Sequence, residues 1–271
     1  MMAFTFPVAG VVVPLWLPPL LAGGIAFFTS MVGISGAFLL VPLQMSLLGF
    51  SAPSASATAL LYNLVAIPGA VLRYRREGRL WWHLAGVIAL GGIPGAWLGA
   101  WLRIHYLAER RTFQLFVAVA LLYLGLRLLL DVRDKPTAGG ETASLPNFSV
   151  PLMVGASFLI GVVSTIYGTG GGAFMVPICV TLFRLPIHAV AGATLMATLL
   201  TSISALSAYL GLPTPAGVAA QPEWLLGILF GLGGFVGAAL GARCQQHVPQ
   251  RLLKAMLAVV LLGLAVRYFA E

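Results

Sequence analysis

Two glycine-rich stretches, GISGAFLLVPL at residues 33–43 and GTGGGAFMVPI at residues 168–178, decide how this chain is expected to fold. Each places several glycines and a later Val-Pro pair inside a long uncharged run. Glycine weakens a helix and proline removes one of its hydrogen bonds, so each stretch predicts a break in an apolar helix. The two stretches align at a spacing of 135 residues, which pairs Pro42 with Pro177. The chain is therefore expected to contain two related halves.

The composition of the 271 residues is that of a membrane protein. Hydrophobic residues make up 60% of the chain and charged residues only 8%, which is too few to cover the surface of a soluble fold. Soluble enzymes, nucleic-acid binders and disordered tails are therefore excluded. The net charge of +8 is expected to come from arginines that flank membrane segments. The two cysteines show no metal or disulfide spacing, so we expect neither a metal nor another cofactor.

The uncharged runs predict eight apolar segments, because a helix needs about 20 apolar residues to cross the hydrocarbon layer. Two of the segments contain the glycine-rich breaks, near 33–36 and 168–172. The expected segments are 10–50, 54–74, 82–103, 111–130, 148–184, 187–211, 223–243 and 250–270. The N-terminal stretch lacks a basic region, so we interpret it as part of the first membrane segment and not as a cleaved signal peptide.

Further correspondences extend the repeat along the chain. Thr58 corresponds to Thr194, and glycines 91, 95 and 99 correspond to glycines 233, 237 and 241. We therefore predict an all-α integral membrane protein with two pseudo-symmetric repeats, 1–130 and 148–271, joined by the polar linker 131–147. Each repeat is a glycine-interrupted helix or re-entrant hairpin followed by three transmembrane helices. Internal repeats are common in secondary transporters, whose substrate site lies at the repeat interface.

The positive charges favour inverted repeats. Parallel halves would divide the fifteen Lys and Arg residues eight to seven between the two sides, whereas inverted halves divide them eleven to four. The larger group comprises Arg73, Arg75, Arg76, Arg79, Arg127, Arg133, Lys135, Arg184, Arg243, Arg251 and Lys254. Because cytoplasmic loops carry an excess of Lys and Arg, we expect this group in the cytoplasm and both termini on the opposite side.

The breaks are the expected substrate site. A helix that restarts after a glycine loop points its free N–H groups and positive dipole end into the cavity, which makes an anion site without a charged side chain. Small hydroxyl side chains lie beside both breaks. The candidate substrate-binding residues are Thr29, Ser30, Gly33, Ser35, Gly36, Thr58, Ser164, Thr165, Thr169, Gly170, Gly171, Gly172 and Thr194. Two alternatives stay open: the hydroxyls bond back to their own helices, and the glycines only permit tight packing.

Other residues near the breaks also have two interpretations. Asn63 lies beside the site or forms a hydrogen bond between helices, and Tyr167 is a gate or a packed aromatic side chain. Thr198, Thr201 and Ser202 follow Thr194 on its segment. The glycines spaced by four residues predict close helix packing, within the chain or between the protomers of a homodimer.

The acidic residues restrict the substrate class. All seven fall in loops or at segment ends, so no carboxylate is expected in the membrane interior to relay protons or to bind cations. We therefore expect a small anion, not a metal cation, held by backbone dipoles and hydroxyls. A protonatable oxyanion could carry a proton itself.

The chain resembles the TauE/SafE family of sulfite and organosulfonate exporters. The resemblance lies in a glycine-rich break, Val-Pro, Ala-x-Ala-Thr, an Arg-rich loop and a Gly-x-x-x-Gly helix, repeated over nearly the whole chain. The family pattern falls on Gly33, Ser35, Gly36, Pro42, Gly168, Gly170, Gly171, Gly172 and Pro177. The chain departs from the pattern at Ser35, Ala37, Ala59 and Leu195. The resemblance implies a multi-pass transporter of the bacterial inner membrane for sulfite or a sulfonate such as sulfoacetate.

Parts of the sequence fit two other functions. An anion channel would use the same site without alternating access. The sequence Gly33-Ile34-Ser35-Gly36 also resembles the Gly-x-Ser-Gly motif of rhomboid-like intramembrane proteases, with His188 as the candidate partner of the serine. The second copy has Gly170 in place of that serine, and a nucleophile is not needed twice. We therefore expect no catalytic residue and no enzymatic activity.

Overall fold

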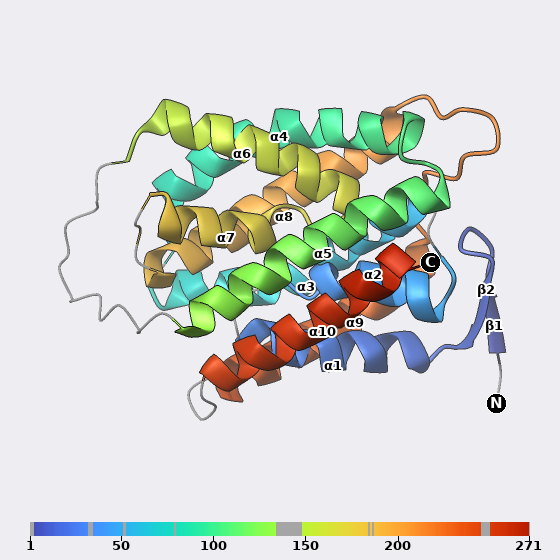
Figure 1. Cartoon of the computed structure of the whole chain (residues 1–271), viewed down its shortest axis with the longest axis horizontal. Helices are drawn as coiled ribbons and strands as arrows, with labels where there is room; N and C mark the ends of the chain where they lie inside the picture. Colours follow the sequence, from blue (N-terminus) through green and yellow to red (C-terminus); the bar gives the residue numbers. More distant parts are fainter. Residues whose placement is uncertain are drawn as a thin grey trace.

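The structure, a computed structural model, describes residues 3–31, 35–50, 53–78, 80–133, 148–183, 185, 187–244 and 250–270. Ten helices and one two-stranded hairpin make up these ranges (Figure 1). The strands are β1 (Ala3–Phe6) and β2 (Val11–Pro14). The helices are α1 (Leu17–Met31), α2 (Ala37–Leu47), α3 (Pro53–Arg76), α4 (Trp82–His105), α5 (Arg110–Arg133), α6 (Val150–Tyr167), α7 (Gly172–Thr181), α8 (Ile187–Gly211), α9 (Trp224–Cys244) and α10 (Gln250–Ala270). These bounds agree closely with the predicted segments from residue 54 onward.

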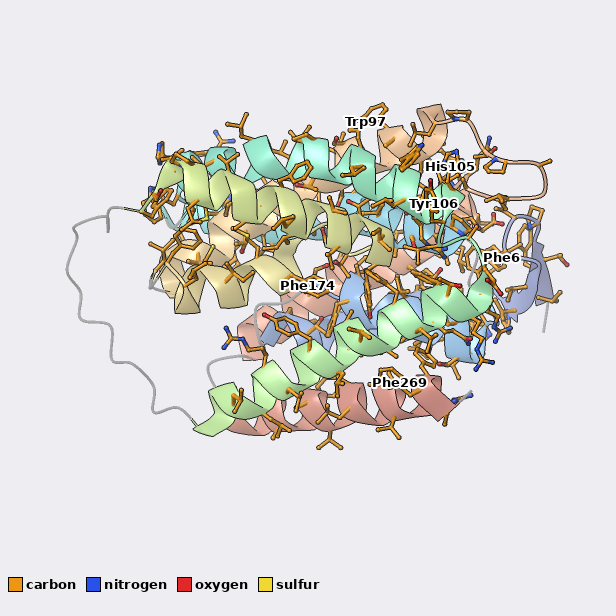
Figure 2. All side chains as sticks on the ribbon, turned by 45° about the horizontal axis from the view of Figure 1, so that its top comes forward. Phe6, Trp97, His105, Tyr106, Phe174 and Phe269 are labelled. Atoms are coloured by element: carbon orange, nitrogen blue, oxygen red, sulfur yellow. The ribbon has the colours of Figure 1, made fainter. Side chains whose placement is uncertain are left out.

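The helices are those of a multi-pass membrane protein. Among the described residues, five helices are long and apolar enough to cross a bilayer: α3, α4, α6, α8 and α9. Their outward faces carry large apolar side chains, such as Leu90 and Trp97 on α4, which are 65% and 44% exposed. Figure 2 shows Trp97 projecting from the outer surface of the bundle. Such faces suit contact with lipid, because hydrocarbon chains do not penalise exposed apolar side chains.

The helices run along the long axis of the molecule, and the chain reverses its direction at each break. In Figure 1, α1 leaves the end that carries the β-hairpin, which we call the hairpin end, and α2 turns back toward it. The Ser46 hydroxyl at the end of α2 lies 2.7 Å from the Tyr268 hydroxyl, close to the C-terminus. α6 starts at the opposite end, and α7 turns back toward that end. Both labelled termini lie at the hairpin end.

The main helix pairs join one half of the chain to the other. α1 packs on α9, and α6 packs on α4. α3 and α8 contact each other in the centre, where α3 also packs on α9 and α8 on α4. α5 and α10 pair on one side of the bundle (Figure 1). Each interrupted helix therefore rests on a helix of the other half.

Glycines make these contacts close. A Cβ added to Gly91 on α4 would lie 2.9 Å from the Cβ of Ser157 on α6. A Cβ added to Gly233 on α9 would lie 2.6 Å from the Cα of Pro19 on α1. Because real Cβ atoms do not approach that closely, only glycine permits these helix separations. The prediction of a small-residue packing face is confirmed, and the contact lies within the chain.

The N-terminal segment corrects the all-α prediction. The first helix begins at Leu17 and not at residue 10, because residues 3–14 form an antiparallel hairpin with Phe6 opposite Val11. Gly10 has φ 65° and donates its N–H to the Phe6 carbonyl at 2.8 Å, which closes the turn. Three consecutive valines at 11–13 favour a strand over a helix. The high hydropathy of this stretch hid that preference.

Candidate functional site

The second glycine-rich break is a sharp loop between α6 and α7. Gly168, Gly170 and Gly171 have φ values of 95°, 72° and 112°, a region that L side chains rarely adopt. α6 ends when the N–H groups of Gly168 and Thr169 both donate to the Ser164 carbonyl at 2.8 Å. α7 restarts at Gly172, and the N–H groups of Phe174 and Met175 donate to the Gly171 carbonyl at 3.2 and 2.9 Å, which leaves those of Gly172 and Ala173 as the donors without an acceptor in their own helix. The break therefore presents backbone donors and a positive helix end to the bundle interior.

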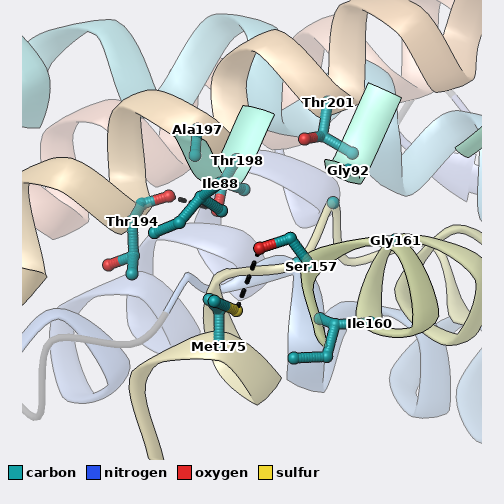
Figure 3. A pocket seen from close by; sticks show the side chains of 12 residues that line it. Ile88, Gly92, Ser157, Ile160, Gly161, Met175, Thr194, Ala197, Thr198 and Thr201 are labelled. Carbon is teal, nitrogen blue, oxygen red and sulfur yellow. Dashed lines mark hydrogen bonds between the residues drawn. The ribbon is translucent and has the colours of Figure 1, made fainter. Parts of the chain in front are cut away.

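A small cavity lies directly beside this break (Figure 3). It has room for about one water molecule. Its lining comes from α4, α6, the break, α7 and α8: Ile88, Gly92, Ser157, Ile160, Gly161, Gly170, Gly171, Met175, Thr194, Ala197, Thr198 and Thr201. The polar lining atoms are hydroxyls and backbone groups, and none of these side chains carries a formal charge.

Three threonines of α8, Thr194, Thr198 and Thr201, lie in the wall of the cavity, whose surface is mostly apolar. Thr194 donates to the Val190 carbonyl at 2.8 Å and Thr198 to the Thr194 carbonyl at 2.7 Å. On the opposite wall, the Ser157 hydroxyl points at the Met175 sulfur at 3.9 Å (Figure 3). A hydroxyl hydrogen can rotate away from its own helix, so these groups can supply donors to a ligand in the cavity.

The first break is built differently. Gly33 lies outside the described residues, whereas Ser35 and Gly36 are buried just before α2. The Ser35 hydroxyl donates to the side-chain oxygen of Asn63 at 2.8 Å and accepts from the Ala37 N–H at 3.4 Å. Gly36 lies against the Tyr62 ring, whose Cζ would be 3.2 Å from a Cβ added at residue 36. An aromatic side chain therefore occupies the space beside this break.

Asn63 on α3 connects the two breaks. Its amide nitrogen donates to the Thr169 carbonyl at 3.0 Å and to the Ser202 hydroxyl at 3.2 Å. Its oxygen accepts from Ser35. The predicted hydrogen bond between helices is confirmed, since α3 and α8 are joined through Ser202. The link to both breaks could not be predicted, because it depends on how α3 packs.

The remaining candidate hydroxyls bond mostly to their own helices. Thr29 donates to the Ala26 carbonyl at 3.5 Å, Ser30 to Phe27 at 3.2 Å and Ser164 to Gly161 at 3.2 Å. Thr58 donates to the Ser54 carbonyl at 2.7 Å and accepts the N–H of Glu223 at 2.9 Å. Thr165 is buried, and its hydroxyl has no hydrogen-bond partner among the described residues.

The structure therefore brings only part of the candidate set to the cavity. Gly170, Gly171 and Thr194 line it. A Cβ added at Gly172 would lie 2.7 Å from the Thr198 hydroxyl, so this glycine also lies close to the lining. The α4 and α6 residues of the lining were missed. One pattern could have found part of them: Ser157, Gly161 and Ser164 lie at helical spacing on a single face of α6.

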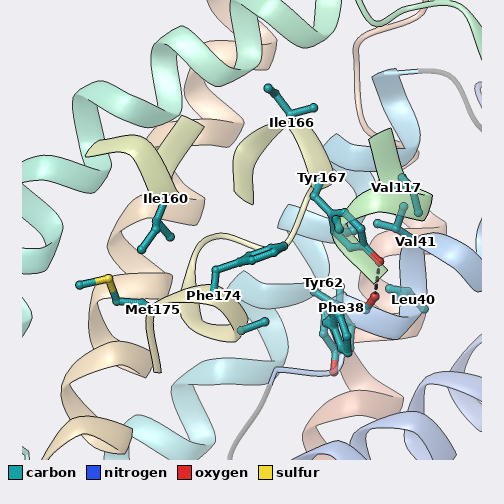
Figure 4. Close-up of a cluster of buried hydrophobic side chains, with 14 of the residues drawn as sticks. Phe38, Leu40, Val41, Tyr62, Val117, Ile160, Ile166, Tyr167, Phe174 and Met175 are labelled. Carbon is teal, nitrogen blue, oxygen red and sulfur yellow. Dashed lines mark hydrogen bonds between the residues drawn. The ribbon is translucent and has the colours of Figure 1, made fainter. Parts of the chain in front are cut away.

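Two large side chains near the breaks, the aromatic Tyr167 and the charged Arg103, are packed within the protein. The Tyr167 hydroxyl donates to the Phe38 carbonyl at 2.9 Å, and its ring stacks on Phe38 (Figure 4). This fully buried ring is packed as the second interpretation of Tyr167 expects. Arg103, expected at a membrane surface, is also buried; its Cζ lies 3.5 Å from the centre of the Phe113 ring, and its Nε donates to Ser56 at 3.3 Å.

The described residues contain no cluster of three or more His, Cys, Asp or Glu side chains suited to a metal ion. Glu223, the acidic residue at the start of α9, is 5% exposed and faces the β-hairpin. Its carboxylate accepts the N–H groups of Val8 at 2.7 Å and Ala9 at 3.1 Å. This carboxylate therefore anchors the hairpin turn.

Comparison with known proteins places the chain among transporters. The probable membrane transporter protein of Xylella fastidiosa strain Temecula1 is 25% identical over 256 residues, covering 90% of each chain. Bacillus subtilis YunE, a probable membrane transporter protein, is 21% identical over 86% of this chain and 89% of its own. A Haemophilus influenzae protein of the same description is 26% identical over 93% of this chain and 97% of its own. No solved structure matches significantly.

The family described as sulfite exporter TauE/SafE matches residues 19–268, which includes all ten helices except parts of α1 and α10. The resemblance seen in the sequence is thereby confirmed. The chain belongs to the sulfite exporter TauE/SafE family of membrane transporters.

Proposed function

We propose that this membrane transporter is a secondary carrier of a small sulfur-containing anion, either sulfite or an organosulfonate such as sulfoacetate. The observation that carries the proposal is the cavity at the second break, which offers hydroxyls and a helix N-terminus and no charged side chain. Such a site stabilises an anion through oriented dipoles. The family description supports sulfite as the first substrate to test.

The substrate site that we propose includes both breaks. Asn63 holds Ser35 and the Thr169 carbonyl together, so a movement at one break is transmitted to the other. The cavity has room for about one water molecule, which is too little for the four heavy atoms of sulfite. Loading therefore requires α7 and α8 to separate. A cavity that must widen to admit its substrate suits alternating access.

We also propose that residues 1–130 and 148–271 are inverted repeats joined by the linker 131–147. The pairing of α1 with α9 and of α6 with α4 supports this, because inverted halves exchange equivalent contacts. The opposite directions of α1 and α6 in Figure 1 support it as well. The linker residues 134–147 lie outside the described residues.

In the bacterial inner membrane, this topology puts eleven of the fifteen Lys and Arg residues in the cytoplasm and both termini outside it. The orientation can be tested with a C-terminal alkaline phosphatase fusion, which is active only outside the cytoplasm. An inactive phosphatase, together with an active cytoplasmic reporter at the same position, would contradict the inverted arrangement.

The transport function is tested by flux into proteoliposomes. We expect saturable uptake of sulfite or sulfoacetate. The rate of uptake should be highest when the membrane potential opposes entry of the anion least. The anion channel alternative predicts flux that rises linearly with concentration. Purified, monodisperse protein that moves neither anion contradicts the proposal. The family consists of membrane transporters and not of enzymes, which leaves the protease alternative without support.

A further inference from the structure

Bulkier side chains surround the first break at the positions that correspond to the lining of the cavity beside the second break. The spacing of 136 residues that pairs Thr58 with Thr194 also pairs Tyr62 with Thr198. The spacing of 142 residues between the glycine stripes pairs Phe230 on α9 with Ile88 on α4. Three large side chains stand opposite smaller ones, Leu61 for Ala197, Tyr62 for Thr198 and Phe230 for Ile88, while Val65 replaces the hydroxyl of Thr201 by a methyl group.

Tyr62 fills the space that these positions enclose. The side chain is 2% exposed. A Cβ added at Gly36, in the first break, would overlap its hydroxyl oxygen. A Cβ added at Gly234, on α9, would lie 2.8 Å from its Cζ and 2.9 Å from that oxygen. One ring therefore reaches from the break to α9 (Figure 4 shows its position beside Phe38).

The equivalent space beside the second break holds two small side chains. A Cβ added at Gly172 would lie 2.7 Å from the Thr198 hydroxyl, and one added at Gly92 would lie 2.8 Å from the Thr201 hydroxyl. Gly92 corresponds to Gly234. The same glycine-lined space thus contains two threonines and a cavity beside the second break and a tyrosine ring beside the first.

We propose that Tyr62 is a built-in plug, so that the transporter holds a single anion, at the second break, although its chain is duplicated. This inference rests on the proposed function and places the bound anion at the second of the two breaks, with the first break closed by Tyr62. A second anion close by would be repelled strongly in the low dielectric of the bundle, because like charges in such a medium interact over several ångströms. The first half then supplies a packed surface against which the second half moves.

The test measures how many sulfite ions bind to each chain. Purified protein in lipid nanodiscs is equilibrated with ³⁵S-labelled sulfite, and bound label is compared with protein concentration. We expect one sulfite per chain for the wild type and for Tyr62→Phe, which keeps the ring and removes only the hydroxyl. Thr198→Tyr, which copies the plug into the second half, should weaken binding at least about tenfold.

Opening the first half gives the positive test. The double variant Tyr62→Thr/Val65→Thr rebuilds the hydroxyls of the second half, and we expect it to bind two sulfite ions per chain. Thermal unfolding in the same nanodiscs establishes that each variant is folded. A folded double variant that still binds one ion overturns the proposal, as does a wild type that binds two.

The single variants decide the question even where the double variant does not fold. Tyr62→Phe that weakens binding as much as Thr198→Tyr would show the Tyr62 hydroxyl to be a ligand and overturn the plug. In that outcome sulfite still binds, so the proposed function survives. A folded wild type that binds neither sulfite nor sulfoacetate instead removes the proposed function and this inference together.

Discussion

The Asn63 amide nitrogen lies 3.0 Å from the carbonyl oxygen of Thr169, so a side chain of the first half satisfies the backbone of the second break. Backbone groups inside a membrane protein need such partners, because no water is available to replace them. Asn63 is fully buried and also accepts from Ser35. One amide therefore stabilises irregular backbone in both halves.

Replacing this amide should destabilise the centre of the bundle. Asn63→Leu keeps the approximate volume but leaves the Thr169 carbonyl and the Ser35 hydroxyl without this partner. Each buried group that loses its bond costs about 1–3 kcal/mol, so we expect a lower melting temperature and loss of sulfite transport. Thermal unfolding in detergent and proteoliposome flux measure the two effects. A variant with wild-type melting and flux would show that Asn63 does not hold the breaks together.

Another buried amide, that of Gln44, leads to the opposite prediction. Both polar side-chain atoms of Gln44 on α2 are buried without a hydrogen-bond partner among the described residues. Gln44→Met retains the length and removes two unsatisfied groups, so we expect the free energy of unfolding to rise by about 1–2 kcal/mol. Comparison of Gln44→Met with Asn63→Leu distinguishes the effect of losing a hydrogen-bonded amide from the effect of losing an amide without hydrogen bonds. A large destabilisation would mean that Gln44 has a partner in the membrane.

The glycines of the second break should tolerate no side chain. Gly171 has φ 112° and lines the cavity, so Gly171→Val strains the backbone and adds a side chain beside the cavity. We expect insertion into the membrane with loss of transport. The control is Gly155→Ala on α6, where an added Cβ meets no atom within 4 Å, and it should transport normally. Normal sulfite flux in Gly171→Val would remove the break from the site.

The glycine stripe on α4 makes a structural prediction. A Cβ at Gly95 would lie 3.1 Å from the Val162 nitrogen and overlap the Phe158 carbonyl, so Gly95→Leu should force α4 and α6 apart. We expect a lower melting temperature and a reduced yield of monodisperse protein. Gly86→Leu on the same helix is the matched control, because Gly86 is exposed and its Cβ would meet nothing within 4 Å. Equal behaviour of the two variants would contradict the close packing.

The hairpin should depend on Glu223. Its carboxylate accepts two N–H groups of the turn, and hydrogen bonds to a charged group are worth about 1.5–3 kcal/mol. We expect Glu223→Ala to speed amide hydrogen exchange in residues 3–14, while Glu223→Gln, which keeps an acceptor oxygen, changes it less. Glu109→Ala, at an exposed carboxylate that accepts from Thr112, should leave this exchange unchanged. Unchanged exchange in Glu223→Ala would show that the hairpin is held by its other contacts.

Hydropathy and glycine spacing predicted the helices well, since both depend on residues close in sequence. The segment expected at 250–270 is α10 (Gln250–Ala270), and the second break falls between Tyr167 and Gly172. The direction of each side chain around a helix was harder to predict. Ser30 bonds to its own helix and Thr194 lines the cavity, a difference that tertiary packing determines. The hairpin was missed because a strand of valines is as apolar as a membrane helix.

The pairing of α1 with α9 has a consequence for biosynthesis. α1 leaves the ribosome among the first parts of the chain, and its packing partner is made near the end. Until then the glycine face of α1 and the polar break behind it have no native neighbour in the bilayer. The nascent chain therefore stays incompletely packed until its last helices have been synthesised. Truncation upstream of α9 should therefore leave α1 and α2 exposed to membrane proteases.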